Sequence, residues 1–262
     1  MSCSVTRTIP PLFVLFALCI LHPTIAWSAD HGFAAEIRKG EEFLAKLFEP
    51  GLDLLPEYKG AKVYWLYHDN YLAAKLLEPS HPDLARRIHS SIHRFGVEQS
   101  GKIELLFGEA KKPVPFRTYQ LLEVTNVSGK IIKTERVTNN LLKGWEAYSD
   151  LLLMAAIAQA KSEPREARTN YHRALQLWDG HGFADPAQKK SGIYATYKLA
   201  LAIIAADTLG ESLPFRAGTI EQLKRLQSDS GGWITDYTST GTAHGLANVE
   251  TTCIALLALK RR

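Results

Sequence analysis

The chain has 262 residues, of which 46% are hydrophobic and 22% charged, and its formal net charge at pH 7 is +4. A chain of this length and composition can bury a core of its own, which excludes the disordered and fibrous classes. The charge is mild and the basic residues are spread over several segments, so the composition argues against binding to nucleic acid.

The N-terminal segment has the pattern of a secretory signal peptide. Arg7 precedes an apolar run at 11–21, and Ala26, Trp27 and Ser28 follow as a small-x-small cleavage site. A membrane anchor is the alternative, but the run is shorter than the ~20 apolar residues that a spanning helix needs. We therefore predict a signal peptide at 1–28, a mature domain at 29–262 without a stable membrane span, and a secreted or periplasmic location.

Two kinds of helix alternate along the mature chain. One kind interleaves charged and apolar residues at helical spacing, which predicts half-exposed outer helices at 83–95, 165–177 and 216–227. The other kind begins polar and continues as an apolar run, which predicts buried inner helices at 67–77, 148–160, 197–206 and 249–259. With a further helix at 30–48, these helices make four hairpins that stack to bury their apolar faces.

The segment from about 102 to 137 departs from this helical pattern. Its stretches KIELLF, FRTYQLLEV and KIIKTERV are rich in residues that favour strands, and 126–129 predicts a turn between the last two. The turn also contains a glycosylation sequon at Asn126, although a turn is the plainer interpretation. The predicted fold is therefore an all-α array of helical hairpins with a small β-hairpin insertion at about 102–137.

Two loops share a pattern that carries a family resemblance. WDGHGFAD (178–185) and SDSGGWITD (228–236) each contain an Asp, a glycine turn, an aromatic residue and a second Asp. QSDSGGW (227–233), followed by ETTCIALLAL, resembles the helix-linking repeats of α/α-toroid proteins, in particular the terpenoid cyclase and protein prenyltransferase superfamily. The six-hairpin glycosidases are a second similar group. The resemblance implies an inner and an outer ring of helices, but the chain lacks the D-x-D-D motif of hopene cyclases and the zinc ligands of prenyltransferases.

In such a ring, the N-terminal ends of the inner helices lie on one rim, and the polar residues there are candidates for chemistry. A desolvated carboxyl that stays protonated can act as a general acid while a second carboxylate activates water. Helix capping is the alternative role for two of these residues, Asp150 and Glu250. The candidate catalytic residues are Asp69, His68, Asp150, Asp236 and Glu250.

Aromatic and polar residues near the same rim are candidates for binding a sugar. Aromatic rings offer an apolar face with a polar edge, which suits a sugar ring, although the same rings can pack between helices. The candidate substrate-binding residues are Trp65, Tyr67, Asn70, Trp145, Trp233, Tyr237 and His244.

Several other chemistries lack support in the sequence. His89 and His93 lie four residues apart, but Ser90 stands where a zinc protease would have Glu, so no metal site is predicted. Cys253 lies inside an apolar run, which predicts a core residue instead of a nucleophile. The chain has no P-loop or dinucleotide fingerprint, so no cofactor is predicted.

The leading functional hypothesis is an exported carbohydrate-active enzyme, a glycan hydrolase or lyase with paired carboxylates. One alternative is a non-catalytic helical scaffold that binds a glycan, a peptide or a partner protein in its concave face. Another is a protein that binds a lipid or an isoprenoid. The sequence leaves the oligomeric state open.

Overall fold

A computed structural model describes residues 31–95, 102–109, 114–187 and 192–261. The signal peptide at 1–28 lies outside these residues, so it stays a prediction, as does export. The described part contains eight α-helices: α1 (Ala34–Leu47), α2 (Leu72–Leu77), α3 (Pro82–Arg94), α4 (Ser149–Gln159), α5 (Pro164–Leu175), α6 (Thr196–Leu209), α7 (Arg216–Arg225) and α8 (Val249–Lys260). Its other helical segments are η1 (His31–Phe33), the π-helix η2 (Leu66–Tyr71), η3 (Ile103–Phe107) and η4 (Trp145–Ala147).

Strands form a larger part of the fold than the sequence predicted. The described strands are β1 (Val63–Trp65), β2 (Arg117–Val127), β3 (Lys130–Leu141), β4 (Ile193–Ala195), β5 (Ile234–Thr238) and β6 (Ala243–Ala247). They form two three-stranded sheets, in the orders β1-β3-β2 and β4-β5-β6. The prediction of an all-α, toroid-like array is therefore wrong, and the fold is mixed α/β. The strands outside the insertion have three to five residues, too few for a periodic signal.

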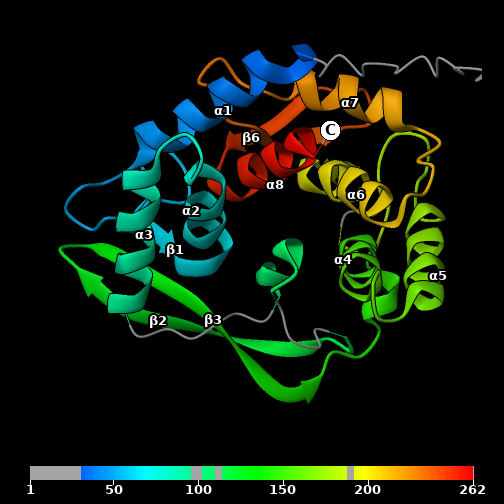
Figure 1. The fold of residues 1–262 in the computed structure, drawn as a ribbon, viewed down its shortest axis with the longest axis horizontal. Coiled ribbons are helices and arrows are strands. Elements are labelled where there is room, and N and C mark those ends of the chain that lie inside the picture. Colours follow the sequence, from blue (N-terminus) through cyan, green and yellow to red (C-terminus); the bar gives the residue numbers. More distant parts are fainter. Residues whose placement is uncertain (1–30, 96–101, 110–113, 188–191, 262) are drawn as a thin grey trace, which may run out of the picture. The chain divides into compact units, whose positions relative to one another are not determined.

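The alternation of inner and outer helices is nevertheless present in the packing. Helices α2, α8, α6 and α4 follow one another, because α8 packs on both α2 and α6, and α6 packs on α4. Outside them, α3 packs on α2, α1 on α8, α7 on α6 and α5 on α4 (Figure 1). The inner helices are buried on nearly all sides: α4 throughout 151–157, α6 throughout 199–206 and α8 throughout 251–259.

Local signals in the sequence explain where several helices begin and end. Pro82 and Pro164 stand at the first helical positions of α3 and α5, where proline's missing N–H costs no hydrogen bond. Gly210 ends α6 with a left-handed backbone. Asn248 caps α8, because its side chain accepts a hydrogen bond from the backbone N–H of Thr251.

The repeated loops are held by the same device in both copies. Each loop closes through an isolated antiparallel bridge, Trp178 with Phe183 in the first and Gln227 with Trp233 in the second. Phe183 and Trp233 are fully enclosed in the core. A Cβ atom added to Gly40 of α1 would lie 2.7 Å from the Trp233 ring, so the glycine permits close contact between α1 and this loop. Phe183 and Trp233 therefore have a structural role in these loops.

The segment predicted as an insertion contains a long β-hairpin. FRTYQLLEV and KIIKTERV form β2 and β3, and Gly129 donates a hydrogen bond to the side chain of Asn126 in the turn between them. KIELLF was predicted to favour a strand, but it forms the 3-10 helix η3, which packs against α4. Four of its five residues are buried, so burial of an apolar segment without strand partners decides its structure.

Candidate functional site

The π-helix η2 contains the polar residues that the sequence analysis singled out. It follows β1 directly and continues into α2. Single π-helical turns are rare and occur frequently at functional sites. Asn70 fixes the turn, because its side chain donates to the backbone oxygens of Leu55 and Trp65 at 3.0 and 2.8 Å and accepts from the N–H of Leu55 at 2.7 Å. All the polar atoms of this amide's side chain are therefore used in holding the backbone.

His68 lies between two carboxylates from distant parts of the chain. Its Nε2 lies 2.8 Å from Oε2 of Glu135 on β3, and its Nδ1 lies 3.3 Å from Oε1 of Glu250 on α8. The three side chains keep 17%, 15% and 31% of their surface exposed, in the order His68, Glu135, Glu250. The cluster is therefore largely, but not completely, shielded from water.

The protonation states of the three groups support one another. Burial alone would lower the pKa of His68, but hydrogen bonds to Glu135 and Glu250 outweigh it and raise this pKa to about 9. Burial would raise the pKa values of both carboxyls, but the hydrogen bonds to His68 lower them. At neutral pH the cluster therefore consists of an imidazolium ion between two carboxylates.

The backbone of a third acidic residue, Glu57, is held beside the first turn of α8. The backbone N–H of Val249 donates to the carbonyl of Glu57 at 2.9 Å, and Tyr58 forms a bridge with Asn248. Burial, and next the negative charge of Glu250, raise the pKa of Glu57. The site thus contains two partly exposed carboxyls whose pKa values shift in opposite directions.

Asp69 lies beneath these groups and is 1% exposed. Burial, followed by the charges of Glu250 and Glu57, raises the pKa of Asp69 well above its usual value. The backbone N–H of Glu250 donates to the Asp69 carboxyl, whereas Oδ2 of Asp69 has no hydrogen-bond partner among the described residues. Burial therefore favours the neutral form of Asp69, and its carboxyl contacts the site through the backbone N–H of Glu250.

A second pair of polar residues, Tyr197 on α6 and Asp150 on α4, lies near the site. The hydroxyl of Tyr197 donates to Oδ2 of Asp150 at 2.8 Å. Burial and the charges of Asp150 and Glu250 raise the pKa of Tyr197 well above its usual value. Polar groups in the first turns of α4, α6 and α8 therefore interact, as the sequence suggested for the inner helices.

The remaining predicted residues divide between the site and the core. The Trp65 ring lies 6.2 Å from that of His68, with Lys133 over its indole at 5.7 Å. Tyr67 is buried on η2, with its ring 5.5 Å from that of Tyr71. Trp145 packs edge-on against the buried Phe116 at 5.3 Å.

The other four predicted residues lie on the second sheet or in the loop before it. Trp233 is fully buried and donates from its indole to the carbonyl of Leu223. Tyr237 is 1% exposed and donates to the carbonyl of His181. Neither ring has a free face for a sugar. Asp236 on β5 lies opposite His244 on β6, and His244 is exposed.

A different buried cluster joins α4 to α6. Asp185 accepts hydrogen bonds from the backbone N–H and the hydroxyl of Ser149, at 3.1 and 2.7 Å, and forms an ion pair with Lys198. The side chains of Lys198 and Asp185 are 2% and 0% exposed. Burial would raise the pKa of Asp185, but its bond to Lys198 lowers it. The cluster is closed to any ligand.

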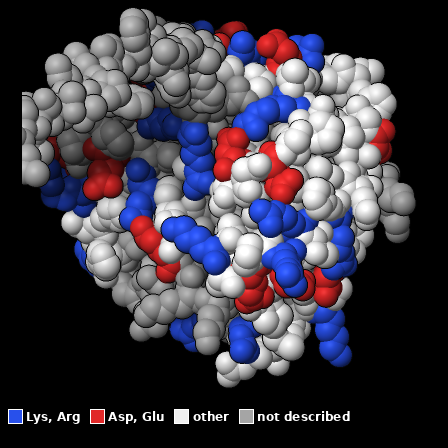
Figure 2. Space-filling view, turned by 45° about the vertical axis from the view of Figure 1, so that its right-hand side comes forward, with Lys and Arg blue, Asp and Glu red and all other residues white. Residues whose placement is uncertain are grey.

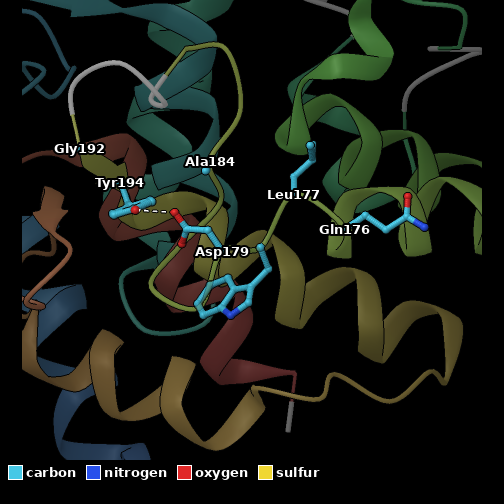
Figure 3. A pocket seen from close by; sticks show the side chains of 7 residues that line it. Gln176, Leu177, Asp179, Ala184, Gly192 and Tyr194 are labelled. Atoms are coloured by element: carbon cyan, nitrogen blue, oxygen red, sulfur yellow. Dashed lines mark hydrogen bonds between the residues drawn. The ribbon is translucent and has the colours of Figure 1, made fainter.

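A pocket of about 350 Å³ lies beside the first repeated loop. Its acidic residue, Asp179, is already hydrogen-bonded within the protein. Figure 3 shows Asp179 and Tyr194 in this pocket joined by a hydrogen bond, which measures 2.6 Å. Asp179 also accepts from the backbone N–H groups of His181 and Gly182. Its carboxylate therefore closes the loop and is not free to bind a ligand.

Other properties of the described residues limit the functions of this site. Within them, no group of three or more His, Cys, Asp and Glu side chains has a geometry suited to a metal ion. No helix in the described ranges is long and apolar enough to cross a membrane. Figure 2 shows acidic and basic side chains interleaved on the face drawn, without a continuous patch of either sign. That face therefore offers no extended surface of one charge to a highly charged partner.

Comparison with known protein families, with curated proteins and with solved structures found no match to this chain. The site is therefore interpreted from its own geometry.

Sequence reasoning missed two members of the site, Glu57 and Glu135. Glu57 lies in a connection after Pro56, and Glu135 lies 67 residues from His68 on the inserted hairpin. No motif spacing joins either residue to η2. One signal was present for Glu135, because a charged residue within a half-buried strand needs a partner.

Proposed function

We propose that the chain is an exported enzyme that acts on a glycan by acid–base catalysis, with Glu57 as the acid and Glu250 as the base. One observation carries this proposal: the backbone of Glu57 is bonded to the first turn of α8, which carries Glu250, and the pKa values of the two carboxyls are shifted in opposite directions. Pairs of titratable groups separated in this way supply the acid and the base in many enzymes.

Each neighbouring residue has a defined part in this proposal. His68, as an imidazolium ion, keeps Glu250 ionised so that it can take a proton from water or from the substrate. Glu135 holds the other edge of the His68 ring. Asp69 is a positioning residue, because it is buried and bonds to the backbone of Glu250. Trp65, beside His68, offers the aromatic face on which a sugar can stack.

The site also argues against one arrangement of catalytic carboxylates. Glu135 and Glu250 face each other across the imidazole ring of His68. An inverting glycosidase needs water and a sugar in the space between its two carboxyls. That space is filled here, so Glu57 is the better partner for Glu250.

Activity of the purified chain 29–262 on a panel of polysaccharides tests this proposal. We expect Glu57→Gln and Glu250→Gln each to lower kcat by about 10²- to 10⁴-fold, the usual contribution of a general acid or base. Glu221→Gln on the outer helix α7 is the matched control, because Glu221 is 64% exposed and pairs only loosely with Lys224 at 3.6 Å. Full activity of Glu250→Gln would remove this residue from the mechanism.

A non-catalytic binding scaffold is the second candidate. The observation that favours it is the engagement of Asn70, Trp233 and Tyr237 in packing and backbone bonds, which leaves fewer side chains to orient a substrate. Binding of a glycan that is equally tight for the parent chain and for Glu57→Gln, with no turnover by either, would support the scaffold.

A further inference from the structure

An apolar pocket of about 450 Å³ lies on the side of the molecule where α1 meets the second sheet. Its volume is in the range of small-molecule sites in proteins, about 300–1,000 Å³. The walls come from α1, from the loop at 58–59, from the repeated loop at 228–230 and from β5 and β6. No residue of the proposed catalytic site lines this pocket, so the inference below is independent of the proposed function.

The floor of the pocket is rigid and apolar. Phe43 is 5% exposed, and a Cβ atom added to Gly232 would lie 2.6 Å from its ring, so the loop glycine holds the ring in close contact. Leu47 and Leu246 add aliphatic walls, and Leu246 is 57% exposed. Leu246 therefore continues the apolar lining of the pocket to the protein surface.

The polar groups around the pocket are of two kinds. The hydroxyls of Ser228 and Ser230 bond to each other at 2.8 Å, and Ser228 also bonds to the carbonyl of Gly232. Lys46 and Lys59 also line the pocket. Lys46 has only a loose, exposed contact with Glu42 at 3.7 Å, and Lys59 has no ion pair among the described residues. Two ammonium groups therefore remain to attract an anion.

We propose that this pocket binds an amphipathic carboxylate of the fatty-acid class, with its hydrocarbon chain on Phe43 and Leu246 and its carboxylate at Lys46 and Lys59. Charge complementarity selects an anionic head group, and the apolar walls select a hydrocarbon chain. An extended peptide on the edge strand β6 fits less well. Gly245 has a left-handed backbone at φ +96° and the β5–β6 register shifts beside it, so this edge is not a regular template for another strand.

Titration calorimetry of the chain 29–262 with decanoate tests this proposal, with decanol as the uncharged probe of equal length. We expect saturable binding of decanoate, and weaker binding of decanol. The double variant Lys46→Gln/Lys59→Gln should lose roughly fivefold to tenfold in affinity for decanoate and little for decanol. Lys161→Gln is the matched control, because Lys161 is an exposed lysine after α4 and outside the pocket.

A second variant separates the hydrocarbon chain from the head group. Leu246→Ser removes an exposed apolar wall and should weaken both probes by about threefold without loss of the folded state, as monitored by circular dichroism. The proposal is overturned if decanoate does not saturate at millimolar concentration. It is equally overturned if the lysine variants leave decanoate affinity unchanged, or if a decapeptide binds this site more tightly than decanoate.

Discussion

Two clusters of buried charge lie at the N-terminal ends of the inner helices, and they differ in how completely their groups are paired. In the cluster between α4 and α6, Asp185 accepts bonds from Ser149, Ala187 and Lys198, and the ion pair is shut off from solvent. In the cluster around η2, three charged side chains keep 15–31% exposure.

The hydrogen bonding of the buried carboxyl oxygens shows the same contrast. Oδ2 of Asp69 has no partner among the described residues, whereas both oxygens of Asp185 accept hydrogen bonds. A fully paired buried network specifies the packing around it, while a partly open one leaves groups available to a ligand. The contrast separates a cluster that stabilises the fold from one suited to chemistry, although both contain an ion pair.

The largest effect should come from breaking the closed cluster. Lys198→Met leaves the Asp185 carboxylate buried without its cation, which typically costs about 3–5 kcal/mol in the free energy of unfolding. Urea denaturation at pH 7 measures this change. Lys161→Met, at an exposed position, should change stability by less than about 0.5 kcal/mol. Similar losses in the two variants would show that the closed cluster does not stabilise the fold.

The open cluster should give stability that depends on pH. The folded pKa of His68 is raised from 6.5 to about 9, so its contribution is fully present below about pH 6.5 and is lost as pH rises through about 9. We expect His68→Asn to cost on the order of 2–3 kcal/mol at pH 6 and much less at pH 10. Denaturation curves at both pH values, with the exposed His172→Asn as control, check this. A pH-independent cost would contradict the raised pKa.

The link between His68 and Glu250 can be tested directly by NMR. Glu250→Gln replaces one of the two carboxylates that stabilise the imidazolium, so the pKa of His68 should fall by about one unit or more. Titration of the His68 ring resonances measures the change, and Glu221→Gln should leave them where they are. An unaltered titration in Glu250→Gln would mean that the 3.3 Å contact carries no interaction of consequence.

The smallest expected effect is a gain in stability. Burial raises the pKa of Asp69 in the folded state, whereas its carboxyl ionises near pH 4 in the unfolded state, so this group lowers stability as pH rises above that value. Asp69→Asn removes this loss and should stabilise the fold at pH 7 by about 1 kcal/mol, with no gain at pH 3. Thermal unfolding at the two pH values tests the sign. A destabilised variant at pH 7 would show that Asp69 is ionised in the fold.

The sequence carried the helical part of the fold because the inner helices are continuous apolar runs and the outer helices repeat apolar residues at helical spacing. The apolar runs at 199–206 and 251–259 were assigned to inner helices from their composition, and both are buried throughout. Pro82 and Pro164 marked helix starts for a local steric reason. The short strands β1, β4, β5 and β6 have no such period, since each is stabilised by pairing with a distant segment or by its own hairpin.

The site was accessible from the sequence only where its residues are adjacent in the chain. His68 and Asp69 attracted attention as a polar head on an apolar helix, and the structure places both in the cluster. Glu57 and Glu135 depend on contacts with residues far along the chain, Val249 and His68 respectively, for which a single sequence offers no periodic signal. Trp233 and Tyr237 show the opposite error, because aromatic character alone does not distinguish a binding face from the core.

The parallel pairing of β1 with β3 determines which residue of β3 lies against His68. Trp65 is opposite Lys133 in this register, and Lys133 and Glu135, two residues apart on β3, reach Trp65 and His68. A slip of one residue would exchange Glu135 for Thr134 or Arg136. Arg136 would set a second cation against the imidazolium. The register of the inserted hairpin therefore determines whether His68 contacts a negative or a positive side chain. Insertions or deletions within β3 should therefore change the charge beside His68 without changing the packing of the helices.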